Sequence, residues 1–275
     1  VVIREGDTLA SLKKKVETAA IIGTLQATLT DFRYLRNLWK RNTEEEALLG
    51  LSMTGIMDHP TLGNSSDKTK QWLEELKEVA ITTNKIWAEK LGIAQSVAIT
   101  CVKPSGTVSQ LVDSASGIHP RFSKQYIRRV RSDKKDPLAV FMEDKGFPVE
   151  QDVMSPASAV FSFPVKAPEK SVTVAEVGAM QQLELWKTYQ NHWCEHKPSI
   201  TVYYTDNEFL QVAQWIWDNF EICSGISLLP VSDHVYQQAP YEDISIEKYN
   251  ELLAAMPQGV SWEDLENFEQ EDNTT

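Results

Sequence analysis

Cysteine is scarce in this sequence, and the cysteines present form no disulfide or metal-binding pattern. The 275 residues include three, Cys101, Cys194 and Cys223, which lie far apart and contain no CxxC spacing. Cys194 and His196 are close, but residues two apart on a predicted helix point in different directions. We therefore expect reduced thiols in a cytoplasmic protein and predict no metal site.

Long apolar runs and an excess of positive charge are also missing. No stretch approaches the ~20 apolar residues that span a bilayer, and the first residues show no signal-peptide pattern. The 27 Lys and Arg residues face 39 Asp and Glu residues, giving a net charge of -12. This balance argues against binding duplex DNA or an anionic membrane, but it permits a small anionic ligand such as a nucleotide. The sequence also begins at Val1 in what reads as the middle of an element, which suggests a truncated, processed or split polypeptide.

Apolar periodicity predicts alternating strands and helices through most of the chain. Strands separated by single helices indicate parallel pairing through right-handed crossovers. Five or six apolar strands are too few to close a large barrel, so an α/β fold is predicted, either half of a barrel or an open sheet that needs a partner. The predicted strands are residues 51–57, 96–102, 126–131, 159–165, 199–204 and 225–231, and the predicted helices are 9–29, 65–91, 136–145, 173–196 and 206–220.

The last thirty or so residues depart from this alternation. A helix is predicted from Ile246 to Met256, followed by a capped turn at Ser261. Residues 269–275 are polar and acidic, a composition typical of disorder. We therefore divide the chain into an α/β domain, residues 1–245, and a C-terminal helical segment with a disordered acidic tail, residues 246–275.

A turn with the chemistry of a phosphate site follows the strand predicted at 96–102. Its sequence is Lys-Pro-Ser-Gly-Thr-Val-Ser, residues 103–109. Pro104 cannot donate to the ladder and so ends the strand, whereas Gly106 lets the backbone approach a ligand closely. If a helix starts within 105–107, its free N–H groups form an anion site.

Side-chain donors add to this turn, but the pattern alone leaves two interpretations open. The hydroxyls of Ser105, Thr107 and Ser109 lie at the same end of the predicted helix. The turn is not a Walker A loop, because GxxxxGK[ST] is absent and Lys103 precedes the glycine. A phosphate cradle and an ordinary capped turn are equally supported by this chemistry.

Three long segments resemble the adenosylcobalamin-dependent ribonucleotide reductases, especially the monomeric triphosphate-reducing type. They are residues 23–60, 101–131 and 223–244, and they occur in the family's order across nearly the whole chain. Agreement of several long motifs in order is a much stronger signal than any one motif alone. The resemblance implies that this chain is the C-terminal half of a ten-stranded α/β barrel, completed by an N-terminal polypeptide.

The same resemblance implies a function and site residues. The family reduces ribonucleotides to deoxyribonucleotides by thiyl-radical chemistry, with adenosylcobalamin as cofactor and a thioredoxin-like reductant. Its substrate is a ribonucleoside di- or triphosphate. When the family's motif is matched residue by residue, the residues implied to bind the substrate phosphates are Pro104, Ser105, Gly106, Thr107 and Ser109. The residues implied to contact the cofactor near the barrel mouth are Ser116, Gly117, Ile118, His119 and Pro120.

The chain also departs from the family in a way that limits its own role. It has no Asn-Pro-Cys-Gly-Glu loop, which carries the family's radical cysteine and general-base glutamate, and its three cysteines match none of the redox positions. No catalytic residue is therefore assigned here, and the expected partner is the N-terminal part or larger subunit of the same reductase. The alternatives are a non-catalytic nucleotide-phosphate-binding or interaction module of the same fold, and part of a large subunit of another reductase class.

Several other residues have both a functional and a structural interpretation. His119 either contacts a ligand or is a satisfied turn histidine, whereas His59 is predicted to be structural. Arg128, Arg129 and Arg131 alternate along a strand, where ion pairs with carboxylates are favoured over ligand contacts. The tryptophans Trp215 and Trp217 are predicted to pack rather than to stack on a base.

Overall fold

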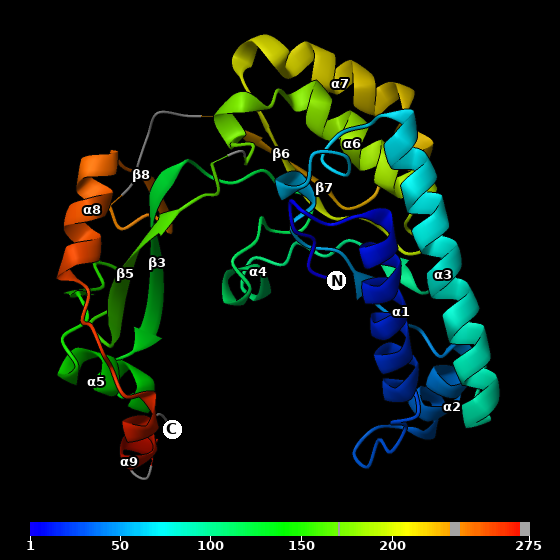
Figure 1. Ribbon diagram of the computed structural model, residues 1–275, viewed down its shortest axis with the longest axis horizontal. Coiled ribbons are helices and arrows are strands. Elements are labelled where there is room, and N and C mark those ends of the chain that lie inside the picture. The colour runs from blue at the N-terminus through cyan, green and yellow to red at the C-terminus, as the bar shows by residue number, and fades with distance from the viewer. Residues whose placement is uncertain (170, 232–236, 270–275) are drawn as a thin grey trace. The chain divides into compact units, whose positions relative to one another are not determined.

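The computed structural model describes residues 1–169, 171–231 and 237–269, which form two compact units (Figure 1). Unit 1 contains the described residues of 1–121 and 171–231, and unit 2 contains those of 122–169 and 237–269. None of the helices within these residues is both long enough and apolar enough to span a bilayer. Of the residues 269–275 predicted to be disordered, Glu269 is the last residue of a helix, and residues 270–275 lie outside the described residues.

Unit 1 combines long helices with short parallel strands. Its helices are α1 (Leu9–Gln26), α2 (Asn37–Glu46), α3 (Asp67–Leu91), α4 (Val108–Leu111), α6 (Ala179–His192) and α7 (Phe209–Asp218). Its strands are β1 (Leu51–Ser52), β2 (Thr100–Cys101), β6 (Ile200–Tyr204) and β7 (Ile226–Pro230). Short 3-10 turns at Ile56–Asp58, Val174–Glu176, Asp206–Glu208 and Phe220–Ile222 connect them.

Parallel pairing, as expected, organises the strands of unit 1. β1 pairs with β2 and β6 pairs with β7, both in parallel. Two single parallel bridges extend this order, from Val2 to Thr54 and from Val102 to Pro198. Residues 1–3, β1, β2, β6 and β7 therefore follow one another as parallel neighbours, a pattern that supports the expected α/β class.

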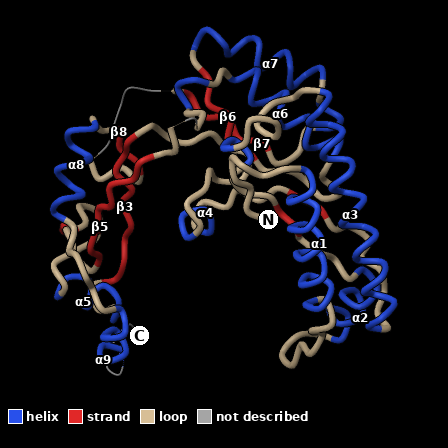
Figure 2. The backbone as a smooth tube through the Cα atoms, in the orientation of Figure 1, coloured by secondary structure: helices blue, strands red, loops and turns tan. Residues whose placement is uncertain are grey.

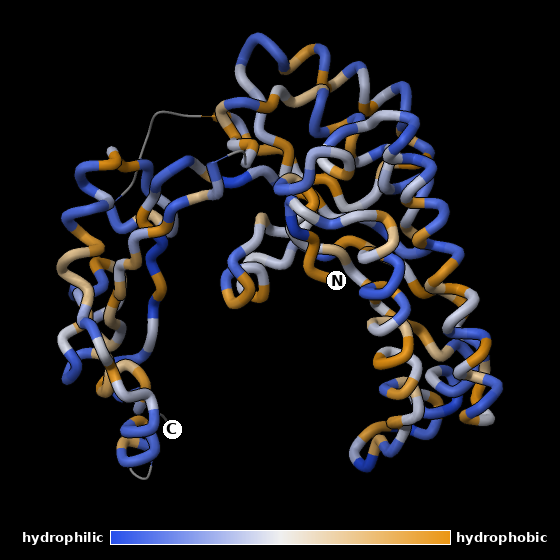
Figure 3. The backbone as a smooth tube through the Cα atoms, viewed as in Figure 1, coloured by the Kyte–Doolittle hydropathy of each residue, from blue (hydrophilic) through white to orange (hydrophobic). Residues whose placement is uncertain are grey.

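The two longest helices lie close to their predicted ranges, although α1 ends three residues before residue 29 and α3 begins two residues after residue 65. Thr8 caps α1 by accepting a hydrogen bond from the Ser11 amide, and Ser66 caps α3 through the Thr69 amide. Gly92 ends α3 with a left-handed φ of 67°. The hydropathy of both helices alternates along the chain (Figure 3), and their apolar faces share one buried core.

Two predicted strands of unit 1 are shorter than expected. The strand predicted at 51–57 is reduced to β1, because Gly55 takes a left-handed φ of 82° and a 3-10 turn follows. A Cβ on Gly55 would lie 2.5 Å from the Ile3 carbonyl oxygen. The strand predicted at 96–102 is reduced to β2. A contact with a distant residue thus ends the first strand early, whereas residues 97–99 still form backbone hydrogen bonds with residues 46–51 beside β2.

The predicted helix at 173–196 is also interrupted. Thr173 and Glu176 form a capping box, but it opens a 3-10 turn and not α6. Val177 is extended, and α6 starts only after Gly178. Helix α6 then presents Trp186 and Tyr189 to the core, where both are fully buried.

Unit 2 is an antiparallel sheet with helices packed on it. The strands are β3 (Gln125–Asp133), β4 (Val149–Gln151), β5 (Ser158–Lys166) and β8 (Tyr241–Asp243), and their spatial order is β4-β5-β3-β8. Figure 2 labels β3, β5 and β8. The helices are α5 (Pro137–Asp144), α8 (Ile246–Ala255) and α9 (Leu265–Glu269), with a 3-10 turn at Trp262–Asp264.

The expectation of parallel pairing is wrong for unit 2. β3 and β5 are antiparallel neighbours over nine residue pairs, from Gln125↔Lys166 to Asp133↔Ser158. The alternation of arginine with apolar residues in β3 already differed from the continuous apolar run of a buried parallel strand. Such alternation is typical of a strand in an antiparallel sheet.

The C-terminal residues belong to unit 2 instead of forming a separate segment. α8 packs on β3 and β5, and α9 packs on α5. Phe141 of α5 contacts the rings of Trp262 and Phe268, and Lys145 forms a 3.1 Å ion pair with Asp264. Residues 246–269 thus belong to unit 2, whereas the sequence predicted a boundary after residue 245.

Candidate functional site

The turn that follows β2 carries three backbone amides that have no acceptor among the residues that the structure describes. The Ser109 amide donates to the Ser105 carbonyl and the Gln110 amide to the Thr107 carbonyl, each at 3.0 Å. Within the described residues, no hydrogen bond uses the N–H groups of Gly106, Thr107 or Val108. Helix α4 has only four residues, so the donors that the turn offers are these individual amides and not the dipole of a long helix.

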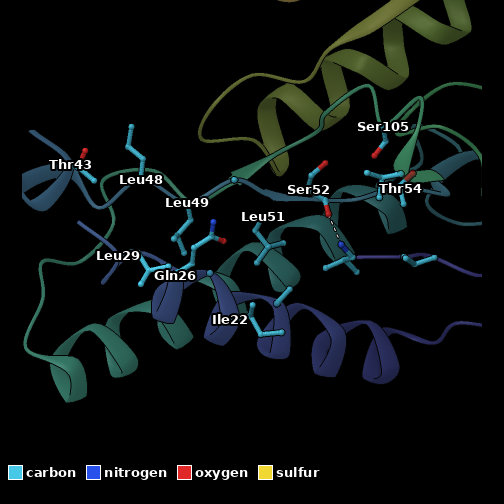
Figure 4. A pocket seen from close by; sticks show the side chains of 17 residues that line it. Ile22, Gln26, Leu29, Thr43, Leu48, Leu49, Leu51, Ser52, Thr54 and Ser105 are labelled. Atoms are coloured by element: carbon cyan, nitrogen blue, oxygen red, sulfur yellow. Dashed lines mark hydrogen bonds between the residues drawn. The ribbon is translucent and has the colours of Figure 1, made fainter. Parts of the chain in front are cut away.

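This turn forms one end of a cavity of about 590 Å³ (Figure 4). Ser105 lies toward one end with Ser52 and Thr54, and Leu29 and Thr43 lie toward the other. The volume is in the range of small-molecule sites. The remaining lining is mostly apolar and comes from residues 1–2, α1 and the approach to β1: Val1, Val2, Ala19, Ile22, Gly23, Gln26, Ala27, Leu48, Leu49, Gly50, Leu51 and Val108.

Two glycines near the turn differ in what they allow. A Cβ on Gly106 would meet no atom of the described residues within 4 Å beyond its two chain neighbours, so there is open space where a side chain at this position would project. Gly117, in contrast, has φ 58°, and a Cβ there would lie 2.4 Å from the Lys103 carbonyl oxygen. Gly106 leaves room for a ligand, whereas Gly117 permits close packing behind the turn.

The predicted phosphate-binding residues divide between the surface of the turn and its interior. Pro104, Gly106 and Thr107 are exposed and Ser105 is half-buried, so all four are reachable from solvent or the cavity. Ser109 is fully buried, and its hydroxyl lies 2.8 Å from that of Ser116. The turn therefore offers two hydroxyls, of Ser105 and Thr107, beside its free amides.

The loop predicted to contact the cofactor is mostly buried and internally bonded. Gly117, Ile118 and Pro120 are buried, and Ser116 contacts Ser109. His119 Nε2 accepts a hydrogen bond from the Thr201 amide at 2.9 Å, so Nδ1 carries the proton and donates to the Ser116 carbonyl at 2.8 Å. Burial lowers the pKa of His119 below its usual value, which favours this neutral form.

Sequence reasoning missed a buried ion pair behind the same loop. Arg121 donates to both carboxylate oxygens of Asp58, at 3.1 and 2.9 Å, and to Asp113 at 3.2 Å. The side chains of Arg121 and Asp58 are only 4% and 8% exposed, and Asp58 also accepts the Ala115 amide at 2.7 Å. Burial alone would lower the pKa of Arg121, but the two carboxylates outweigh it and raise that pKa. The partners are 63 residues apart, and no local pattern links them.

His59 and two of the three arginines have the structural partners expected, whereas Arg128 lies over a tyrosine ring and not beside a carboxylate. His59 Nδ1 accepts the amides of Thr61 and Leu62 at 3.1 Å, and its Nε2 lies 3.0 Å from the Asp7 carbonyl oxygen. In unit 2 the pairs are Arg129 with Glu242, Arg131 with Asp152, and Arg128 over the ring of Tyr241.

The two tryptophans of α7 differ from each other. Trp215 is buried against Trp186 and donates to Glu184, so the packing interpretation is confirmed for it. Trp217 is 79% exposed, because it lies on the side of the helix away from the core, and the packing interpretation is wrong for it.

The cysteines are free thiols in unit 1. Cys101 and Cys194 are buried and Cys223 is partly buried, and burial raises the pKa of all three. Raised pKa values make these thiols poor nucleophiles at neutral pH. Within the described ranges, no cluster of three or more His, Cys, Asp or Glu side chains has the geometry to hold a metal ion.

Comparisons with known proteins identify relatives of this chain. No family model matches the chain. An adenosylcobalamin-dependent ribonucleoside-triphosphate reductase of Euglena gracilis is 30% identical over 229 residues, which cover 81% of this chain and 31% of that protein. The enzyme of the same name from Lacticaseibacillus paracasei is 26% identical, covering 84% of this chain and 34% of that protein. A probable enzyme of this kind from Dictyostelium discoideum is 29% identical, covering 80% and 29%.

A solved structure shares the fold. The crystal structure of a B12-dependent (class II) ribonucleotide reductase superposes with a TM-score of 0.77 at 22% identity, covering 98% of this chain and 40% of that one. The chain spans about a third of the length of the curated relatives that it matches. The resemblance seen in the three sequence segments is therefore confirmed: this chain is a homologue of one part of the adenosylcobalamin-dependent ribonucleoside-triphosphate reductases.

Proposed function

We propose that this chain supplies the substrate-phosphate side of an adenosylcobalamin-dependent ribonucleotide reductase. The observation that carries the proposal is the set of free amides at Gly106, Thr107 and Val108 beside a cavity of about 590 Å³. The relatives are named for the reduction of ribonucleoside triphosphates, so a ribonucleotide is the ligand whose phosphates this turn would hold. Free amides and hydroxyls are the donors that phosphate oxygens accept.

The contribution of this chain to the reaction is binding and orientation. Phosphate oxygens would accept hydrogen bonds from the three amides and from the hydroxyls of Ser105 and Thr107. The rest of the nucleotide would then lie along the cavity, at a fixed distance from the turn. Holding a substrate in one orientation is worth several kcal/mol of activation barrier. The radical cysteine and its general base would come from the polypeptide that corresponds to the remaining length of the relatives.

The parallel strand order supports half of a barrel. Residues 1–3, β1, β2, β6 and β7 form a parallel series with two ends. Within the described residues β7 pairs with β6 alone, and Leu228, Leu229 and Val231 are 39%, 47% and 53% exposed. An unpaired edge with exposed apolar side chains favours association with further strands. We infer that an N-terminal polypeptide or larger subunit supplies them and completes the ten-stranded barrel.

In the complete enzyme, adenosylcobalamin would supply the chemistry that generates the radical. The loop of residues 116–120 does not fit a direct role in holding this cofactor. The hydroxyl of Ser116 and both ring nitrogens of His119 have protein partners, and the other three residues are buried. A cofactor contact here would require breaking those interactions. The described residues of this loop instead support the turn, and the cofactor's contacts would come from elsewhere.

The proposal is tested by reconstitution. The chain would be combined with the missing polypeptide, adenosylcobalamin, a ribonucleoside triphosphate and a thioredoxin-type reductant, and deoxynucleotide formation measured. Product formation that depends on this chain supports the reductase. A non-catalytic module of the same fold would give none, and the same product without adenosylcobalamin would indicate another reductase class.

Gly106→Val should raise the KM for the nucleotide in this assay at least about tenfold, since each charge-assisted hydrogen bond contributes about 1.5–3 kcal/mol. The branched side chain would project beside the free amides, into space where a Cβ meets no atom of the described residues within 4 Å beyond its chain neighbours, and would obstruct a phosphate bound there. Gly6→Val is a matched control, because a Cβ on Gly6 also meets no protein atom within 4 Å and Gly6 is not part of the turn. An unchanged KM in Gly106→Val would exclude the turn as the phosphate site.

Light scattering after size-exclusion chromatography should show that the chain binds the N-terminal polypeptide tightly. The expected interface is large, above ~2,000 Å², because it would complete a barrel core. A well-behaved 31.1 kDa monomer, with cooperative unfolding and no affinity for that polypeptide, would rule out the half-barrel.

A further inference from the structure

Two serine hydroxyls meet in the interior behind the turn. Ser109 Oγ and Ser116 Oγ are 2.8 Å apart, and Gln110 Nε2 lies 3.3 Å from Ser109 Oγ. Ser109 is 0% exposed and is the buried residue of α4. Its backbone is tied as well, since the Ser109 amide donates to Ser105 and its carbonyl accepts from Ser114, both at 3.0 Å. Ser109 is therefore the point at which the turn is fixed to the protein interior.

The loop that carries Ser116 is anchored independently of the turn. The Gly117 amide donates to Thr54 Oγ1 at 3.0 Å, and Thr54 Oγ1 donates to the Ala115 carbonyl at 2.9 Å. The Ala115 amide donates to Asp58, which is held in turn by Arg121. Residues 115–121 thus form a rigid support on the residues that follow β1.

The turn itself has few other attachments. The Lys103 amide donates to Ser52 Oγ at 2.9 Å at the start of the turn. Beyond it, Val108 and Leu111 are 57% and 83% exposed, so α4 buries almost no apolar surface. Without apolar packing, polar contacts must determine where the free amides lie. The Ser109–Ser116 contact is the side-chain contact that joins α4 to the anchored loop.

We propose that Ser109 and Ser116 are positioning residues, whose hydroxyl contact sets the placement of the amides of Gly106, Thr107 and Val108. A phosphate oxygen cannot reach Ser109 Oγ without displacing Ser116, so Ser109 acts through the turn and not on the ligand. This inference rests on the proposed function where nucleotide affinity is concerned. The ordering of the turn by the hydroxyl contact is independent of any ligand.

A double-mutant cycle tests the contact. Wild type, Ser109→Ala, Ser116→Ala and the double variant would be compared by amide hydrogen exchange at residues 106–108, without ligand. Their Kd for cytidine triphosphate would be measured by calorimetry. Each single variant should exchange faster and bind about fivefold more weakly, the effect of one lost hydrogen bond. The double variant should match the singles, because either change already removes the same contact.

A matched control separates positioning from general loss of stability. Ser96→Ala removes a side-chain contact of 2.9 Å to Asn84 that does not touch residues 103–121. It should leave both the exchange at 106–108 and the Kd unchanged. If Ser109→Ala does not fold, Ser116→Ala removes the same contact from a half-buried position and carries the exchange test alone.

The outcomes distinguish this inference from the proposed function. A raised Kd in Ser109→Ala together with an unchanged Kd in Ser116→Ala would overturn the positioning role, since Ser109 would then touch the ligand. Additive effects in the double variant, or unchanged exchange in both singles, would overturn it too. If wild type does not bind cytidine triphosphate while exchange follows the expected cycle, the proposed function fails and the ordering of the turn by the two serines stands.

Discussion

Gly117→Ala is expected to lower the free energy of unfolding of unit 1 by about 3 kcal/mol, the combined cost of a left-handed alanine and of overpacking. Gly117 has φ 58°, and its added Cβ would lie 2.4 Å from the Lys103 carbonyl oxygen. A backbone oxygen cannot rotate away as a side chain can. The turn must therefore move, and nucleotide binding should weaken together with stability. Urea unfolding of wild type and variant gives the free-energy difference.

Gly92→Ala is the control that separates backbone strain from the clash. Gly92 has a similar φ of 67°, but a Cβ there would meet no atom within 4 Å. It should cost only about 1 kcal/mol, from the left-handed conformation alone. Equal losses in the two variants would show that the turn does not pack against Gly117 as described.

Arg121→Met is expected to cost about 3–5 kcal/mol, because removing one partner of a buried ion pair leaves the other charge uncompensated. Asp58 would keep the Ala115 amide but lose both guanidinium hydrogen bonds, in a position where its side chain is 8% exposed. Arg121→Met with Asp58→Asn should recover part of this loss, since no buried charge then remains. Chemical unfolding of wild type and the two variants measures both effects.

Lys70→Met provides the comparison with an exposed ion pair. Lys70 lies 2.9 Å from Asp67, whose side chain is 98% exposed. Exposed pairs of this kind contribute at most about 0.5 kcal/mol. If Arg121→Met costs no more than Lys70→Met, the Arg121–Asp58 pair is not the anchor of the supporting loop.

The elements that the sequence predicted best are those set by neighbouring residues. α1 and α3 follow from apolar periodicity together with the caps at Thr8, Ser66 and Gly92, all within a few residues of the helix ends. The strand predicted at 51–57 failed because Gly55 turns against the Ile3 carbonyl, a contact between distant residues. The antiparallel partners of β3 likewise depend on where the chain returns after α5.

Within the candidate site, too, the features set by neighbouring residues were predicted and the contacts between distant residues were not. The residues KPSGT predicted a turn with free amides, since proline, glycine and hydroxyl residues act locally on the backbone. They did not show that Ser109 is turned inward toward Ser116, or that Arg121 reaches back 63 residues to Asp58. Both contacts depend on how 113–121 folds over the residues after β1, which no local pattern encodes.

Amide resonances of the turn give the most direct test of the phosphate site. In a titration of the isotope-labelled chain with a ribonucleoside triphosphate, we expect the largest chemical-shift changes at Gly106, Thr107 and Val108, whose amides have no acceptor among the described residues. Inorganic tripolyphosphate should move the same resonances, and Gly106→Val should abolish the response. Saturable shifts elsewhere in the chain, with these three amides unmoved, would contradict the assignment of the turn as the site that holds the substrate's phosphates.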